Sequence, residues 1–286
     1  MPFRDTIRPL ASSKTLLSVS FLAAGMGVYS LLAMWKDNSQ YREYLDMPSD
    51  IHAALLVVLG WLLVFRTNTA YSRWWEARTL WGTLVNTSRN LSIKLIEFGR
   101  PDEQERAMLA SLIASFPCQL RDHLRGIPAS RPEDPPNSEL DQRAVHAPIS
   151  TAHAIYRWLS TRIPSEKMDG NEMRTIDLEL AKLLEVCGAC ERIAKTPFVR
   201  SYRTFVRQCI TLVLLSFPWG IAHDFGWWTV LITIVVSYFM IGMETIAEHI
   251  EEPFGFDEDD LDLDGMCLTI ERSVKQIFGN TLKQKN

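Results

Sequence analysis

The sequence predicts an all-helical integral membrane protein. The fifteen residues Ile51–Phe65 carry no acidic or basic charge, and a stretch rich in arginine and tryptophan follows them without a proline. Pro48 and Pro101 bracket the whole region, and proline is the strongest helix breaker. One helix between them is about 75 Å long at 1.5 Å per residue, against a hydrocarbon layer of roughly 30 Å. We therefore expect a long second helix that begins in the membrane and continues into water.

Two other segments are long enough to cross a bilayer. Residues 15–35 form the first, and residues 225–243 form the last. The last segment begins beside Trp227 and Trp228, which are typical of the membrane–water interface. Both segments are therefore predicted to be membrane spans.

Two shorter segments bring the expected number of spans to four. The second span is placed at residues 50–66, and the third at residues 208–223, which contain Pro218. Segments of this length also fit a helix buried in a soluble core, so this alternative stays open. Asp224 is the only charge between the third and fourth segments, which indicates a tight hairpin.

The distribution of basic residues sets the expected orientation. Lysine and arginine are concentrated before residues 15–35, after residues 50–66 and before residues 208–223. The loop at residues 36–50 holds only two basic residues. Because basic loops stay in the cytosol, both chain termini are expected there. The first apolar segment lacks a small-residue cleavage site, so we expect a span and not a signal peptide.

The remaining chain, residues 67–207 and 244–286, is expected to be cytosolic and helical. Helical periodicity predicts elements at 102–125, with a kink or break at Pro117, at 150–162, at 171–194 and at 262–277. Residues 126–141 are rich in proline and are expected to form a loop. With no strand pattern and no repeat, residues 1–286 are predicted to form one membrane-plus-cytosol unit.

Composition argues against several classes of function. The net charge of −4 does not favour binding to nucleic acid, which is itself negatively charged. Cys187 and Cys190 have the spacing of half a zinc site, but no second pair completes it, so we interpret both as packing residues. The six histidines are scattered and suggest no catalytic arrangement. The chain is therefore not expected to be an enzyme.

An acidic motif follows the last span, at residues 248–271. Asp260–Gly265 with Glu271 satisfies the EF-hand pattern on paper. Pro253 and Gly255 break the helix that such a loop needs, and apolar leucines interrupt the loop itself. Two other interpretations of the acidic motif stay open. It forms either an oxygen-rich turn that suits a hard cation or a solvated acidic loop.

Two motifs resemble those of one known family. The sequence FRTNTAYSRWWEARTLWGTLVNTSRNL at residues 65–91 resembles the signature of bestrophins, especially prokaryotic ones, and IEEPFGFDEDDLDLDGMCLTIE at residues 250–271 resembles their second motif. The resemblance covers roughly residues 5–280, with the hairpin at residues 208–243 in the expected place. It implies a homopentameric ion channel of the bacterial inner (plasma) membrane. The implied partners are copies of itself, membrane lipids and small inorganic ions.

The resemblance also implies two constrictions in a central pore. A hydrophobic neck corresponds here to Val57, Trp61 and Phe65, whose spacing of four residues places them along one helical face. A packing face between helices is the alternative interpretation. The second constriction, a cytosolic aperture, corresponds to one of three residues that the sequence does not separate: Ile176, Leu178 and Leu180.

Charges near the neck admit two interpretations. Arg66 and Arg73 follow it, and they either raise the anion concentration at the cytosolic mouth or pair with Glu76 and acidic residues 248–264. The family name indicates chloride, while prokaryotic members leave monovalent cations open. A membrane scaffold or receptor that binds a cytosolic partner through residues 100–200 is the alternative function.

Calcium is the one ligand that the resemblance leaves open, and no cofactor is required. In animal bestrophins a calcium clasp lies at the acidic motif, and its ligands correspond here to the carboxylates of Asp257 and Asp260 and the backbone carbonyl of Glu252. Phe256 stands where an acidic residue is usual in animal members, which puts the clasp in doubt. Prokaryotic members need not be gated by calcium.

Overall fold

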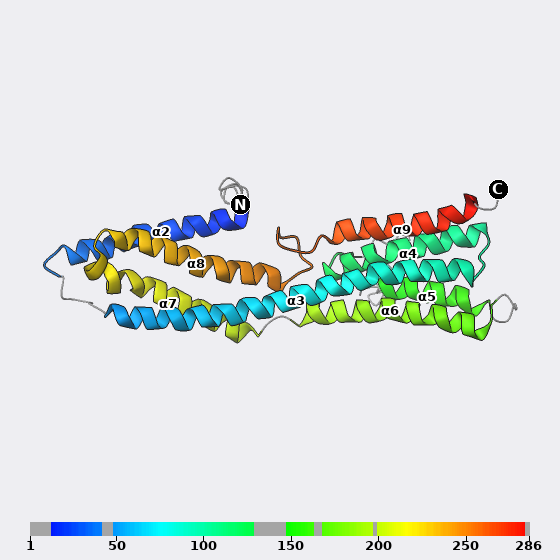
Figure 1. Ribbon diagram of the computed structural model, residues 1–286, viewed down its shortest axis with the longest axis horizontal. Helices are drawn as coiled ribbons and strands as arrows, with labels where there is room; N and C mark the ends of the chain where they lie inside the picture. The colour runs from blue at the N-terminus through cyan, green and yellow to red at the C-terminus, as the bar shows by residue number, and fades with distance from the viewer. Residues whose placement is uncertain (1–12, 42–47, 129–146, 163–167, 197–198, 284–286) are drawn as a thin grey trace, which may run out of the picture. The chain divides into compact units, whose positions relative to one another are not determined.

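The computed structural model describes residues 13–41, 48–128, 147–162, 168–196 and 199–283 (Figure 1). Within these ranges the chain forms helices and no strand, which confirms the all-helical class. The helices are α2 (Lys14–Asp37), α3 (Ser49–Glu97), α4 (Glu103–Leu124), α5 (Ala147–Ser160), α6 (Gly170–Lys195), α7 (Arg200–Phe225), α8 (Trp228–Glu251) and α9 (Leu263–Lys283).

The contacts divide the chain into two compact units. The first comprises residues 1–74, 197–253 and 257–259, and the second comprises residues 75–196, 254–256 and 260–286. Helix α3 contributes residues to both. The single unit predicted for residues 1–286 therefore stays a prediction.

The long second helix is confirmed. Helix α3 has 49 residues and begins directly after Pro48, whose carbonyl accepts a hydrogen bond from the amide of Ile51. The helix ends before Gly99, where a Cβ atom would lie 2.5 Å from the carbonyl oxygen of Leu95 and 2.7 Å from the Trp158 ring. A side chain does not fit there, and Pro101 then prevents the helix from resuming.

Among the described residues, four helices are long and apolar enough to cross a membrane, and all belong to the first unit: α2, the N-terminal part of α3, α7 and α8. Leu59 and Leu63 of α3 pack against a cluster on α7 formed by Val206, Ile210, Val213 and Leu214. The predicted hairpin between α7 and α8 is present, with Gly226 in the left-handed region at φ 51°. Helices α2 and α8 approach closely at Gly27, where a Cβ atom would lie 2.4 Å from Ile234 Cγ1.

The second unit is a bundle of the C-terminal part of α3 with α4, α5, α6 and α9. Helices α4 and α6 begin with capping boxes at Asp102 and Asp169. Helix α4 runs without a break through Pro117, so the interruption allowed for there does not occur. The predicted loop at residues 126–141 lies mostly outside the described residues.

Buried side chains from all five helical segments form the core of the second unit. They include Trp81, Leu84, Leu91, Phe116, Leu120, Ile155, Ile176, Leu180 and Ile270. Cys187 and Cys190 are also buried in α6, which confirms their packing role. Burial raises the pKa of each thiol to about 12, so both stay protonated at neutral pH.

Candidate pore-lining site

The three residues predicted to form the neck lie on the exposed face of α3. Val57, Trp61 and Phe65 are 63%, 66% and 58% exposed, although all three are large and apolar. On the other side of the helix Leu59 and Leu63 are buried. At 3.6 residues per turn, Trp61 lies about 160° around the axis from each of these leucines. The predicted neck face therefore points directly away from the core of the first unit.

This exposed face changes from apolar to polar along the helix. The rings of Trp61 and Phe65 lie 6.1 Å apart between centroids. The next exposed positions on the same face are Asn68 and Ser72, which are polar and uncharged. Such a change is expected where a helix face passes from an apolar environment into water.

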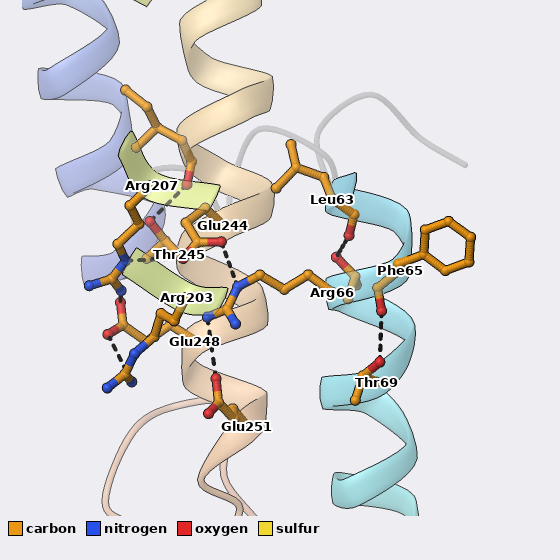
Figure 2. Close-up of polar contacts among 12 residues, drawn as sticks. Leu63, Phe65, Arg66, Thr69, Arg203, Arg207, Glu244, Thr245, Glu248 and Glu251 are labelled. Atoms are coloured by element: carbon orange, nitrogen blue, oxygen red, sulfur yellow. Dashed lines mark hydrogen bonds and ion pairs between the residues drawn. The ribbon is translucent and has the colours of Figure 1, made fainter. Parts of the chain in front are cut away.

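Arg66 is buried, whereas its neighbour Phe65 is exposed, and two carboxylates hold the Arg66 side chain (Figure 2). Its Nε donates to Glu244 Oε2 at 2.6 Å, and its Nη2 donates to Glu251 Oε2 at 3.2 Å. Both acceptors belong to α8, and the Arg66 side chain is only 1% exposed. Because a charge buried at this depth must be compensated, the pairs fix how α3 is rotated against α8.

Further arginines of α7 extend this network. Arg207 Nε donates to Glu244 Oε1 at 3.0 Å, and its Nη2 forms an ion pair with Glu248. Arg203 Nη1 lies 3.9 Å from Glu248 Oε1. Glu244 therefore bridges an arginine of α3 and an arginine of α7, so the ionic network ties three helices together.

Sequence reasoning missed Glu244 as a partner of Arg66, and Arg207 as the second arginine that pairs with Glu244. Both residues stand at the ends of predicted spans. Arg207 directly precedes residues 208–223, and Glu244 directly follows residues 225–243. Paired charges at the ends of neighbouring spans are the signal that could have found them.

Arg73 and Trp74 are directed toward the end of α8 and the acidic turn. Arg73 Nε donates to the backbone carbonyl of Glu251 at 3.3 Å. Trp74 Nε1 donates to the carbonyl of Asp259 at 3.1 Å, and its ring stacks on Tyr71. In the second unit, Glu76 pairs with Arg192 at 2.6 Å.

The three residues considered for the aperture have different surroundings. Ile176 and Leu180 are fully buried in the core of the second unit. Leu178 is 55% exposed, on the other face of α6. Of the three, only Leu178 presents an apolar side chain to the outside of its subunit.

The acidic motif forms a turn followed by α9, not an EF-hand loop. Helix α9 begins at Leu263, and the Asp262 side chain accepts from the amide of Gly265 at 2.8 Å. Asp264 Oδ1 and Oδ2 pair with Arg121 Nη1 at 2.5 Å and Arg125 Nη1 at 3.1 Å. Its carboxylate is therefore engaged within the bundle, and an EF-hand that uses it is excluded.

The predicted calcium ligands keep the status of a prediction. Glu252 and Asp257 are exposed, and Asp260 is half-buried. Among the described residues no group of three or more His, Cys, Asp or Glu side chains is arranged to hold a metal ion. The predicted set contains two carboxylates and a backbone carbonyl, so this observation does not decide it.

Comparison with known proteins decides the family. The family model described as Bacterial/Fungal Bestrophin protein matches residues 7–276. The chain belongs to the bestrophin family. The predicted resemblance is thus confirmed, and it extends over nearly the whole of this bestrophin.

Relatives with similar sequences carry a functional name. Three of them are called voltage-dependent anion channel-forming proteins. The protein of Nostoc sp. is 33% identical over 77% of this bestrophin and 75% of the relative. That of Synechocystis sp. is 32% identical over 96% and 89%, and that of Mesorhizobium japonicum is 34% identical over 78% and 73%.

Solved structures of bacterial bestrophins share the fold. A crystal structure of a bacterial bestrophin homologue from Klebsiella pneumoniae matches with a TM-score of 0.80 at 24% identity. The match covers 92% of this bestrophin and 98% of that chain. The likeness establishes the fold, including its four apolar helices.

Proposed function

We propose that this bestrophin forms a homopentameric anion channel of the bacterial inner membrane, with both termini in the cytosol. Membership of the family and the anion-channel names of its relatives support this function. The single observation that carries it is the exposed apolar face of α3, which points away from the subunit core. A monomer would leave this face, and the polar stripe that continues it, without a suitable environment.

The neck of the proposed pore consists of Val57, Trp61 and Phe65 from each subunit. Five such faces around an axis make a ring of large apolar side chains, which controls ion flow by excluding water when narrow. The buried ion pairs of Arg66 support this arrangement, because they hold the opposite side of α3 against α8. Arg66 is thus assigned to positioning the neck, and its charge is not counted among those at the mouth.

The cytosolic aperture is assigned to Leu178. Ile176 and Leu180 are enclosed by their own subunit, so neither reaches a shared pore without disrupting the core. Leu178 is exposed and apolar on a face that is otherwise charged or polar. We assign no catalytic step to the protein, because conduction through the two constrictions needs neither a covalent intermediate nor a cofactor. Calcium at Asp257, Asp260 and Glu252 is left as an independent proposal.

Cysteine accessibility in reconstituted channels tests the pore-lining assignment. Trp61→Cys and Phe65→Cys should be modified by a water-soluble thiol reagent, and the attached group should block the current. Leu55→Cys is the matched control, because Leu55 is exposed on α3 but lies about 120° around the axis from Trp61. The wild type treated with the same reagent shows whether modification of the native cysteines changes the current.

Native mass spectrometry in mild detergent tests assembly in the same preparations. The proposal expects pentamers. Block of the control but not of the two neck variants, or a monomeric protein, would contradict it. Intact pentamers without any current would favour the scaffold or receptor function.

A further inference from the structure

The exposed face of α6 is charged on both sides of Leu178. Arg174 lies four residues before Leu178, Lys182 lies four residues after it, and Glu185 lies seven residues after it. All three are exposed. At 1.5 Å per residue, Arg174 is displaced from Leu178 by about 6 Å along the helix and Glu185 by about 10 Å.

Other charged groups within one turn of Leu178 have partners inside the subunit. Glu179 Oε1 accepts from Lys94 Nζ at 2.7 Å and lies 3.4 Å from Lys182 Nζ. Asp177 accepts a hydrogen bond from the Tyr156 hydroxyl. Burial, together with Asp177, raises the pKa of Tyr156 to about 12, so the tyrosine stays neutral and leaves the charge of Asp177 in place.

Arg174 is the exception. In the part of the chain that the structure describes, its guanidinium makes no hydrogen bond and no ion pair. The charged groups around Leu178 are three cations and two carboxylates. The cations are Arg174, Lys94 and Lys182, and the carboxylates are Asp177 and Glu179. Among these five groups each subunit therefore carries one positive charge in excess beside Leu178. Arg174 is exposed and is the cation of the three that makes no ion pair with a described residue.

We propose that Arg174 is a specificity-determining residue, which favours anions at the cytosolic aperture. This inference rests on the proposed function, in which Leu178 narrows the pore. Five copies of Arg174 would form a ring of positive charge one helical turn from the aperture. The Debye length at physiological salt is about 8 Å, so the charge of Arg174 reaches Leu178 while that of Glu185, at about 10 Å, is largely screened. The ring therefore concentrates anions at the aperture and repels cations.

The test measures the chloride-to-potassium permeability ratio from reversal potentials of reconstituted channels under a KCl gradient. Arg174→Glu should lower this ratio by at least about threefold near 0.15 M salt, as expected for unit charges about 6 Å apart in water. Arg174→Gln should give a smaller decrease in the same direction. Near 1 M salt, where the Debye length is about 3 Å, the difference from wild type should disappear.

Matched variants separate the charge from its position. Arg157→Glu makes the same charge change at an exposed site on α5 and should leave the ratio unchanged. Glu185→Gln should change it less than Arg174→Gln. An unchanged ratio in Arg174→Glu, an equal change in Arg157→Glu, or a change that persists undiminished near 1 M salt would overturn the assignment of Arg174 while leaving a functional channel. A wild type without current would instead overturn the proposed function.

Discussion

Phe65 and Arg66 are consecutive residues of α3, yet the first side chain is exposed and the second is buried in an ion pair. Phe65 is 58% exposed, whereas the Arg66 side chain is 1% exposed and its Nε lies 2.6 Å from Glu244 Oε2. Because neighbouring helical residues are about 100° apart, a fixed Arg66 also fixes the direction of Phe65. The orientation of α3 about its own axis thus determines both the buried ion pair and the direction of the proposed neck residues.

Removal of the Arg66 charge should destabilise the protein strongly. Arg66→Gln removes the buried ion pairs with Glu244 and Glu251, and breaking a buried pair costs about 3–5 kcal/mol. Thermal unfolding in detergent should show a large decrease in the melting temperature. Arg203→Gln is the control, because its 3.9 Å pair with Glu248 is partly exposed and should contribute at most about 1 kcal/mol. Equal melting temperatures for the two variants would contradict the role of Arg66.

Truncation of the neck should increase conduction without changing assembly. Trp61→Ala and Phe65→Ala each remove a large apolar group from the proposed ring, so water should enter it more easily and the open probability or current should increase. Phe239→Ala makes the same chemical change on the exposed surface of α8 and should leave the current unaltered. Single-channel recording of the three variants at equal pentamer yield measures this. Unaltered currents in both neck variants would indicate a packing face.

Asp264 should make the attachment of α9 to α4 dependent on pH. Arg125, and then Arg121, hold the pKa of its carboxyl below its usual range. A lowered pKa contributes stability above the unfolded value of about 3.9, and this stability is lost as the pH falls through the folded value. Because Asp264 is 58% exposed, the contribution should be about 1 kcal/mol or less.

Melting curves of wild type and Asp264→Asn between neutral and acidic pH would check this. The wild type should be the more stable protein at neutral pH, and the difference should close in acid. Glu271→Gln serves as the control, because within the described ranges Glu271 forms an ion pair only with Lys275, one turn away on the same helix. A difference that is constant over the whole range would exclude the ion pairs as its cause.

Cys118 should be the most reactive thiol of the second unit. A hydrogen bond from the Cys267 thiol lowers the pKa of Cys118 to about 7, whereas burial keeps Cys187 and Cys190 protonated. Alkylation by iodoacetamide, followed by peptide mass spectrometry, should give a pH midpoint near this value. Cys267→Ala should raise this midpoint, because it removes the hydrogen bond that lowers the pKa of Cys118. Preferential modification of Cys187 or Cys190, which are the internal controls, would be incompatible with this description.

The sequence could predict the long helix because its evidence is local. A stretch without proline between Pro48 and Pro101 is enough to expect α3, and four apolar runs are enough to expect four spans. The pairing of charges is not local. Arg66 and Glu244 are 178 positions apart, and helical periodicity contains no information about which helix faces which.

The sequence held more information on the aperture than our prediction used. Ile176 and Leu180 share a face because they are four residues apart, and Leu178 lies about 160° from each of them around the axis. Periodicity therefore separates Leu178 from the other two residues. Apolar residues recur on the side of Ile176 and Leu180, while Arg174 and Lys182 flank Leu178, so the pattern also indicates which side of α6 is buried. The packing of the bundle agrees with this pattern.

The most direct test of the proposed function is a recording from the purified wild-type protein in a planar bilayer under a KCl gradient. An anion-selective pore predicts discrete channel currents that reverse near the equilibrium potential of chloride. Currents that reverse near the equilibrium potential of potassium would contradict anion selectivity, and the absence of current from intact pentamers would contradict the channel itself.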